Sequence, residues 1–146
     1  MSDTARRILL GIFLLGVVGL GAELLLLGHY EDFYQLIPLF LFGAAVAALG
    51  VMLITPTGTT VRVFQAVMAF FLLSGVIGAA LHFQVNVEFQ LEMDPSLRGM
   101  ALFQKAIRAT APPALAPGAM IQLGLSGLAY TFRHPAVVAS GLRRTM

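Results

Sequence analysis

The stretch ILLGIFLLGVVGLGAELLLLG, residues 8–28, decides the fold class of this chain, because it is long and apolar enough to cross a lipid bilayer. A spanning helix needs about 20 apolar residues at a rise of about 1.5 Å per residue. Three runs of similar character follow, over residues 36–54, 61–81 and 114–132. Because backbone polar groups in hydrocarbon must pair with one another, each run is predicted to be a helix. The sequence therefore predicts an all-α membrane protein with four transmembrane helices.

The amino-acid composition also indicates a membrane protein and excludes functions that need cysteine. The chain has 146 residues, of which 58% are hydrophobic and only 11% charged. Soluble globular proteins carry about 25% charged residues. This length fits one domain, so residues 1–146 are predicted to form a single transmembrane unit. The chain has no cysteine, which excludes disulfides, iron–sulfur clusters and thiol chemistry.

The positions of the cations predict the orientation. Six arginines fall on one side of the predicted helices: Arg6, Arg7, Arg62, Arg133, Arg143 and Arg144. The positive-inside rule then places both termini in the cytoplasm, and we expect the protein in a cell inner membrane. The connections over residues 28–35 and 55–60 are short, which favours an up-down-up-down bundle. Residues 82–113 are predicted to form an external, periplasmic loop.

The first part of this external loop has an unusual pattern. From Phe83 to Glu92, apolar and polar residues alternate strictly. A period of two is typical of a strand, yet the chain offers no second strand to pair with. Three interpretations are open: strand addition to another subunit, an extended segment on the bundle surface, or continuation of the third helix. Continuation would place Phe83, Val87 and Leu91 on one face.

The second part of the loop is predicted to be an amphipathic helix between the third and fourth spans. Asp94 and Pro95 are typical of an N-cap and a first helical position. The helix would extend to Ala111 and lie flat at the headgroup boundary. Its predicted apolar face consists of Leu97, Met100, Phe103 and Ile107.

Small residues in the four runs mark expected helix contacts. In lipid, small side chains let helix backbones approach one another closely. Within the bundle, or against a second copy or a partner, the expected contact positions are Gly11, Gly16, Gly19, Gly43, Ala47, Gly50, Ser74, Gly75, Gly78, Ala79, Gly124 and Gly127.

Glu23 is the sharpest candidate for a functional residue. It is the one ionisable residue in the first run, and a carboxylate within a membrane span is a functional hypothesis by default. It could hold a proton or a cation, with Gln122, Ser74 and Ser126 as possible partners. The alternative is that Glu23 faces a polar inlet and only orders helix packing.

A second candidate site lies at the predicted outer face. His29 and His82 end the first and third runs on the same side, and Glu31, Glu88 and Glu92 lie near them in sequence. Imidazole and carboxylate ligands together suit zinc, copper or manganese. The alternative is that these are ordinary interfacial histidines and solvated acids.

These patterns favour a non-enzymatic protein. No catalytic set, cofactor motif or nucleic-acid module is present. The leading hypothesis is a structural or accessory subunit of the inner membrane, which contacts the lipid bilayer and acts through homo-oligomerisation or a membrane-protein partner. The alternatives are a small transporter or ion-coupled carrier that uses Glu23, and a metal-binding membrane protein.

Overall fold

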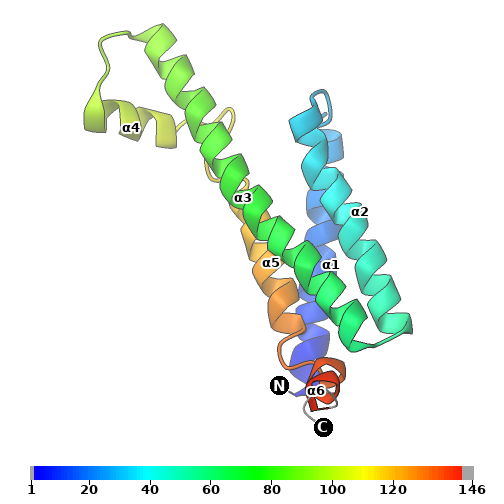
Figure 1. Cartoon of the computed structure of the whole chain (residues 1–146). Helices are drawn as coiled ribbons and strands as arrows, with labels where there is room; N and C mark the ends of the chain where they lie inside the picture. The colour runs from blue at the N-terminus through cyan, green and yellow to red at the C-terminus, as the bar shows by residue number, and fades with distance from the viewer. Residues whose placement is uncertain (1, 143–146) are drawn as a thin grey trace.

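The computed structural model describes the backbone of residues 2–142 and the side chains of residues 2–139. Arg143 and Arg144 lie outside the described residues. The elements are all helices: α1 (Asp3–Leu26), α2 (Phe33–Ile54), α3 (Gly58–Met93), α4 (Gly99–Ile107), α5 (Gly118–Tyr130) and α6 (Pro135–Leu142). Figure 1 shows α1, α2, α3 and α5 running along one another, with α4 crossing near one end and α6 at the other. The prediction of an all-α protein is confirmed for the described chain.

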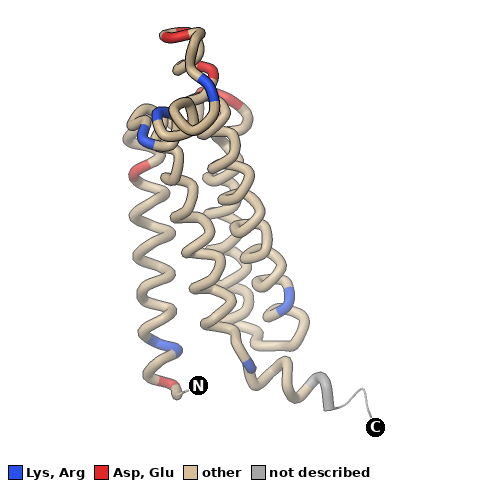
Figure 2. Tube along the Cα trace, turned by 90° about the vertical axis from the view of Figure 1, so that its left-hand side faces the viewer, with Lys and Arg blue, Asp and Glu red and all other residues tan. Residues whose placement is uncertain are grey.

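Three of the helices, α1, α2 and α3, are long and apolar enough to cross a membrane. Figure 2 shows charged residues gathered toward the two ends of the helices, with an uncharged band between them. We call these ends the α4 end and the terminal end. This distribution is typical of a membrane protein, because transfer of a charged side chain into hydrocarbon is energetically unfavourable.

The predicted fourth span is shorter than expected. Helix α5 has 13 residues, which at about 1.5 Å per residue reach roughly 20 Å, less than the hydrocarbon core of about 30 Å. The preceding residues 111–117 form turns instead of a helix. Pro112, Pro113 and Pro117 fall in or next to this segment, and proline lacks the amide hydrogen that a helix interior requires. The prediction of full-length helices is therefore confirmed for three of the four runs.

Local sequence ends α1 and starts α3 sharply. Gly28 adopts a φ of 66°, and the amide of His29 donates to the carbonyl of Leu24 at 2.8 Å. This is a Schellman motif, which glycine favours because it has no Cβ. Thr57 and Thr60 cap α3 reciprocally through their hydroxyl groups and amides. These tight ends make α1, α2 and α3 antiparallel neighbours, as predicted.

Helix α3 is the centre of the molecule and packs against α2, α4, α5 and α6. It continues without a break to Met93, so the alternating segment is helical and both non-helical interpretations were wrong. The third interpretation is confirmed. Helical hydrogen bonds extend directly from the apolar span, and no strand within residues 2–142 offers a pairing edge. The Phe83 ring then packs on Phe103 of α4, with centroids 5.6 Å apart.

Helix α4 begins later than predicted. Asp94 is the C-cap of α3 and not an N-cap, because its Oδ1 accepts hydrogen bonds from the amide and hydroxyl of Ser96, at 3.1 and 2.6 Å. That local turn competes with helix formation. The helix starts at Gly99 and ends at Ile107, short of the predicted Ala111.

Aromatic rings and glycines build the core. The Phe13 ring lies 5.6 Å from that of Phe64 and joins α1 to α3. A Cβ on Gly124 would lie 2.9 Å from the carbonyl oxygen of Met68, so α3 and α5 pack backbone to backbone. A Cβ placed on Gly16, Gly75, Gly78, Gly124 or Gly127 would likewise lie against another helix or the segment before α5, which confirms the close contacts predicted there. A Cβ placed on Gly11, Gly19, Gly43 or Gly50 would meet no atom within 4 Å beyond the adjoining turns of its own helix.

Candidate functional site

The most organised polar site at the α4 end joins α3 to the segment before α5. His82 and Asn86 lie one turn apart on one face of α3. Nδ1 of His82 is 3.0 Å from the carbonyl oxygen of Pro113, and Nδ2 of Asn86 donates to the carbonyl oxygen of Pro112 at 2.9 Å. Asn86 is only 1% exposed. We call these four groups the polar clamp, because they hold residues 109–117 against α3.

The clamp selects the tautomer of His82. A carbonyl oxygen can only accept a hydrogen bond, so Nδ1 of His82 carries the hydrogen. In the neutral ring, Nε2 then carries the lone pair. This geometry leaves one ring nitrogen of His82 able to bind a proton or a metal ion.

His29 lies near His82. Partial burial, and next the positive charge that His82 can carry, lower the pKa of His29 below its ordinary value. His29 is therefore a neutral base at pH 7. The two histidines that the sequence singled out, one just beyond α1 and one on α3, thus lie close enough for their charges to interact.

The carboxylates do not join this pair. Within the described part of the chain, no three His, Asp or Glu side chains gather as a metal-binding group. Glu88 accepts a hydrogen bond from Gln84 at 3.0 Å, and Glu31 and Glu92 are exposed. The predicted five-residue set is therefore not assembled among the described residues, although the charges of its two imidazoles interact.

Glu23 lies in the last turn of α1 and is exposed. Gly16 of α1 faces Leu123 of α5, so Gln122 lies near the level of Gly16. Seven residues of helix separate Gly16 from Glu23, which places Glu23 about 10 Å nearer the α4 end.

Ser74 does not approach Glu23 either. It precedes Gly75, which contacts Ile121 at the level of Gln122. Ser126, another possible partner, donates to the carbonyl of Gln122 at 2.8 Å. The predicted partners of Glu23 are therefore grouped at mid-height, away from its carboxylate.

Gln122 lies instead on an open groove between α1 and α5. The groove is lined by Leu9, Gly118, Ile121, Gln122, Leu125, Ser126 and Ala129. The Gln122 side chain is exposed there. An exposed amide among apolar residues is a potential hydrogen-bonding point for a neighbouring helix.

Sequence reasoning missed the structural role of Arg6 at the terminal end. Its Nη1 donates to the carbonyl of Tyr130 at 2.9 Å, and its Nη2 to those of Phe132 and Arg133 at 3.0 and 3.1 Å. A guanidinium at a helix C-terminus satisfies free carbonyls and complements the helix dipole. No local signal could reveal this contact, because its partners lie more than 120 residues away in sequence.

His134 lies beside the same contact. Partial burial, and next the charge of Arg6, lower the pKa of His134. Nearby, Nε2 of Gln65 donates to Oγ1 of Thr131 at 3.3 Å, which adds a link between α3 and the end of α5. This group of contacts fixes the terminal end.

Comparison of the chain with protein-family models, with curated proteins and with solved structures found no match. The functional argument therefore rests on the geometry of the chain itself.

Proposed function

We propose that this protein is a multi-pass inner-membrane accessory subunit that works without catalysis, through close contact with a second copy or with a larger membrane protein. In this proposal both termini face the cytoplasm, and α4 lies at the opposite surface. Helix α5 and the preceding residues 109–117 together complete the fourth crossing. The polar clamp supports this last point, since it pairs two carbonyl groups of the non-helical segment.

The observation that carries the proposal is a small-residue face on α2. Gly43, Ala47 and Gly50 recur at intervals of four and three, so they share one face of the helix. Gly43 and Ala47 are exposed, and a Cβ on Gly43 or Gly50 would meet nothing within 4 Å. The buried residues of α2, among them Phe42 and Leu49, point elsewhere.

These glycines serve no contact within the described chain. A glycine inside a helix costs about 1 kcal/mol relative to alanine. Lipid gains nothing from a small side chain, whereas a neighbouring helix can approach closely over one. Within the protein, Gly75 and Gly124 allow α3 and α5 to approach closely. The small-residue face of α2 points outward, so we infer that a helix from another chain packs on it.

The transporter and metal-binding alternatives have less geometric support. Glu23 lies at the end of its helix, apart from Gln122 and Ser74. His29 and His82 lack a third protein ligand among the described residues. Within the part of the chain that the structure describes, neither alternative has an assembled set of groups.

The test uses the absence of native cysteine. Gly43→Cys and Gly50→Cys are cross-linked in native membranes, with Val76→Cys on the exposed face of α3 as the matched control. We expect a specific adduct from both α2 positions and none from Val76→Cys. Native mass spectrometry of gently extracted protein then identifies the adduct as a second copy or a different chain. A lone monomer without α2 cross-links would refute the proposal.

A further inference from the structure

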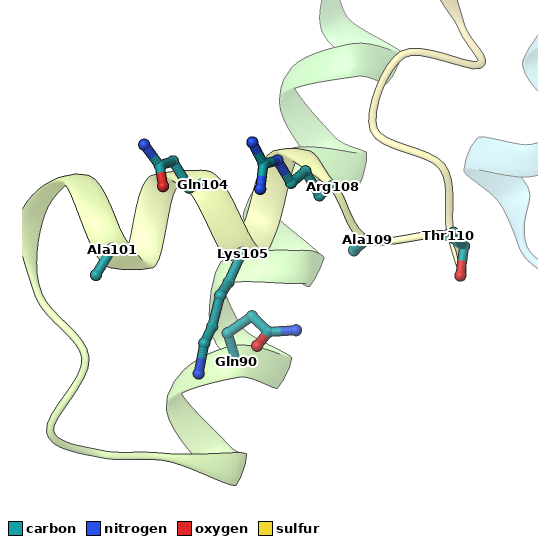
Figure 3. Close-up of a pocket in the computed structure, with 7 residues that line it drawn as sticks. All are labelled: Gln90, Ala101, Gln104, Lys105, Arg108, Ala109 and Thr110. Atoms are coloured by element: carbon teal, nitrogen blue, oxygen red, sulfur yellow. The ribbon is translucent and has the colours of Figure 1, made fainter.

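A basic depression of about 460 Å³ lies between α4, the last turns of α3 and the segment after α4. Five polar side chains from these three places line it: Gln90, Gln104, Lys105, Arg108 and Thr110. Figure 3 shows Lys105 extending toward Gln90, while Gln104 and Arg108 point from the other side of α4. The depression therefore combines two cations with neutral hydrogen-bonding groups, and no carboxylate lines it.

The side-chain nitrogen atoms of Lys105 and Arg108 are available as hydrogen-bond donors. Within the described residues, neither Lys105 nor Arg108 makes a side-chain hydrogen bond or an ion pair. The third cation of this region is already engaged, because Nη1 of Arg98 donates to the carbonyls of Pro95 and Leu97. The pKa of Asp94 is lowered mainly by hydrogen bonds from Ser96, both accepted by Oδ1, and to a smaller extent by the charge of Lys105.

The position of α4 indicates what reaches these cations. Figures 1 and 2 place α4 near the level where α1 ends and α2 begins, lying across the direction of the long helices. On α3, Phe83 lies about 10 Å nearer the membrane than Gln90. Phe103 packs on Phe83, whereas Lys105 points toward Gln90. The aromatic side of α4 therefore faces the bilayer, and Lys105 faces away from it.

The apolar residues of α4 complete an interfacial helix. Met100 is 67% exposed and Phe103 is 49% exposed. Exposed apolar side chains on one side and a cation, here Lys105, on the other are the arrangement by which a helix lies in the headgroup region. The depression would then open at the depth of the lipid phosphates.

We propose that this depression binds the phosphate group of an anionic phospholipid in the leaflet at the α4 end. Lys105 and Arg108 line the depression from opposite sides of α4, and each would turn toward the phosphate oxygens to donate charge-assisted hydrogen bonds, while Gln90, Gln104 and Thr110 would surround the headgroup. A free phosphate ion offers the same oxygens. The lipid is the source proposed because Met100 and Phe103, on the same helix, supply a surface for acyl chains that a free ion would not use.

The test measures lipid retention by the intact protein. Wild type in mixed phosphatidylcholine and phosphatidylglycerol nanodiscs is transferred to detergent, and native mass spectrometry counts the bound lipids. We expect selective retention of phosphatidylglycerol. Each cation near a lipid surface contributes about 1 kcal/mol, so retention should weaken about fivefold in Lys105→Gln and about thirtyfold in Lys105→Gln/Arg108→Gln.

Two further variants separate the site from general charge. Ala101→Glu places an acid in the depression and should also weaken retention, whereas Lys105→Arg should preserve it. Arg62→Gln removes an exposed cation at the other end of α3 and should change nothing. Circular dichroism and melting temperature identify any variant that fails to fold.

Three results would overturn the proposal. Equal retention by wild type and the double variant would show that the depression holds no lipid. An equal loss in Arg62→Gln would show that net charge, and not the depression, controls retention. Displacement of phosphatidylglycerol by millimolar inorganic phosphate, with phosphate binding equally well to protein without lipid, would make the ligand a free anion.

Discussion

Arg6 donates a hydrogen bond of 2.9 Å from Nη1 to the carbonyl oxygen of Tyr130, and so joins the first turns of α1 to the last turn of α5. The bond is partly buried and charge-assisted. It supplies the C-terminal cap that the sequence of α5 lacks, because the last turn of α5 contains no basic residue. The two ends of the described chain are thereby held together at one surface.

Replacement of Arg6 tests this contact. Arg6→Gln should lower the free energy of unfolding by about 2 kcal/mol, since hydrogen bonds from charged groups contribute about 1.5–3 kcal/mol when partly buried. The measurement is the unfolding midpoint in detergent. Arg7→Gln is the matched control, because Arg7 is exposed and makes no side-chain hydrogen bond or ion pair with the described residues. Equal midpoints for the two variants would contradict the capping role.

The polar clamp should control the order of the segment before α5. Asn86→Ala leaves the carbonyl of Pro112 without its partner and opens a cavity, so it should cost about 1–3 kcal/mol. We expect faster proteolysis and amide exchange within residues 109–117. Gln84→Ala, which changes an exposed residue on the same turns of α3, should leave both rates unchanged. Unaltered rates in Asn86→Ala would show that the clamp does not order this segment.

Addition of a single methyl group at the contact between α3 and α5 should destabilise the protein. A Cβ on Gly124 meets the carbonyl oxygen of Met68 at 2.9 Å, where backbone must move. Gly124→Ala should therefore destabilise the fold by about 1–3 kcal/mol. Gly19→Ala meets open space and should be neutral, or stabilising by up to about 1 kcal/mol. Thermal unfolding of both variants compares them directly, and the reverse order would contradict this packing.

Stability should fall as the solution becomes mildly acidic. The pKa of His29 and that of His134 are both lowered in the folded protein, so the unfolded chain takes up these protons first. Linkage then makes the free energy of unfolding decrease as pH drops from about 6.5, the ordinary histidine pKa, down through the lowered folded values.

A variant isolates one histidine of the two. His29→Gln should reduce the slope of melting temperature against pH between about pH 7 and 5, while His134 maintains the remainder. The slope above about pH 7.5 should not change. A wild-type slope in His29→Gln would assign the whole effect to other groups.

The sequence by itself determined the fold class and most helix positions. Hydrophobic length and internal backbone pairing are local properties, so residues 8–28, 36–54 and 61–81 could be recognised as helices without knowledge of their neighbours. The tight connections were also readable, since Gly28 and Thr57 act within a few residues of themselves. Of the candidate site residues, His29, His82, Glu31, Glu88 and Glu92 were expected at the same end of the bundle, but the sequence could not show that the carboxylates would stay apart from the histidines.

Only the tertiary structure decided the remainder. The continuation of α3 through the alternating segment could not be decided by periodicity, which favours a strand as well as a helix; in the structure the helix continues and Phe83 packs on Phe103 of α4. Helix α5 is shortened by Pro112 and Pro113, and the carbonyl groups of these residues, which no helix hydrogen bond satisfies, accept hydrogen bonds from Asn86 and His82. Gln122 and Ser74 were separated from Glu23 by the relative heights of the helices. Such heights, like the reach of Arg6 to Tyr130, are set by side-chain packing between segments distant in sequence, which no local pattern encodes.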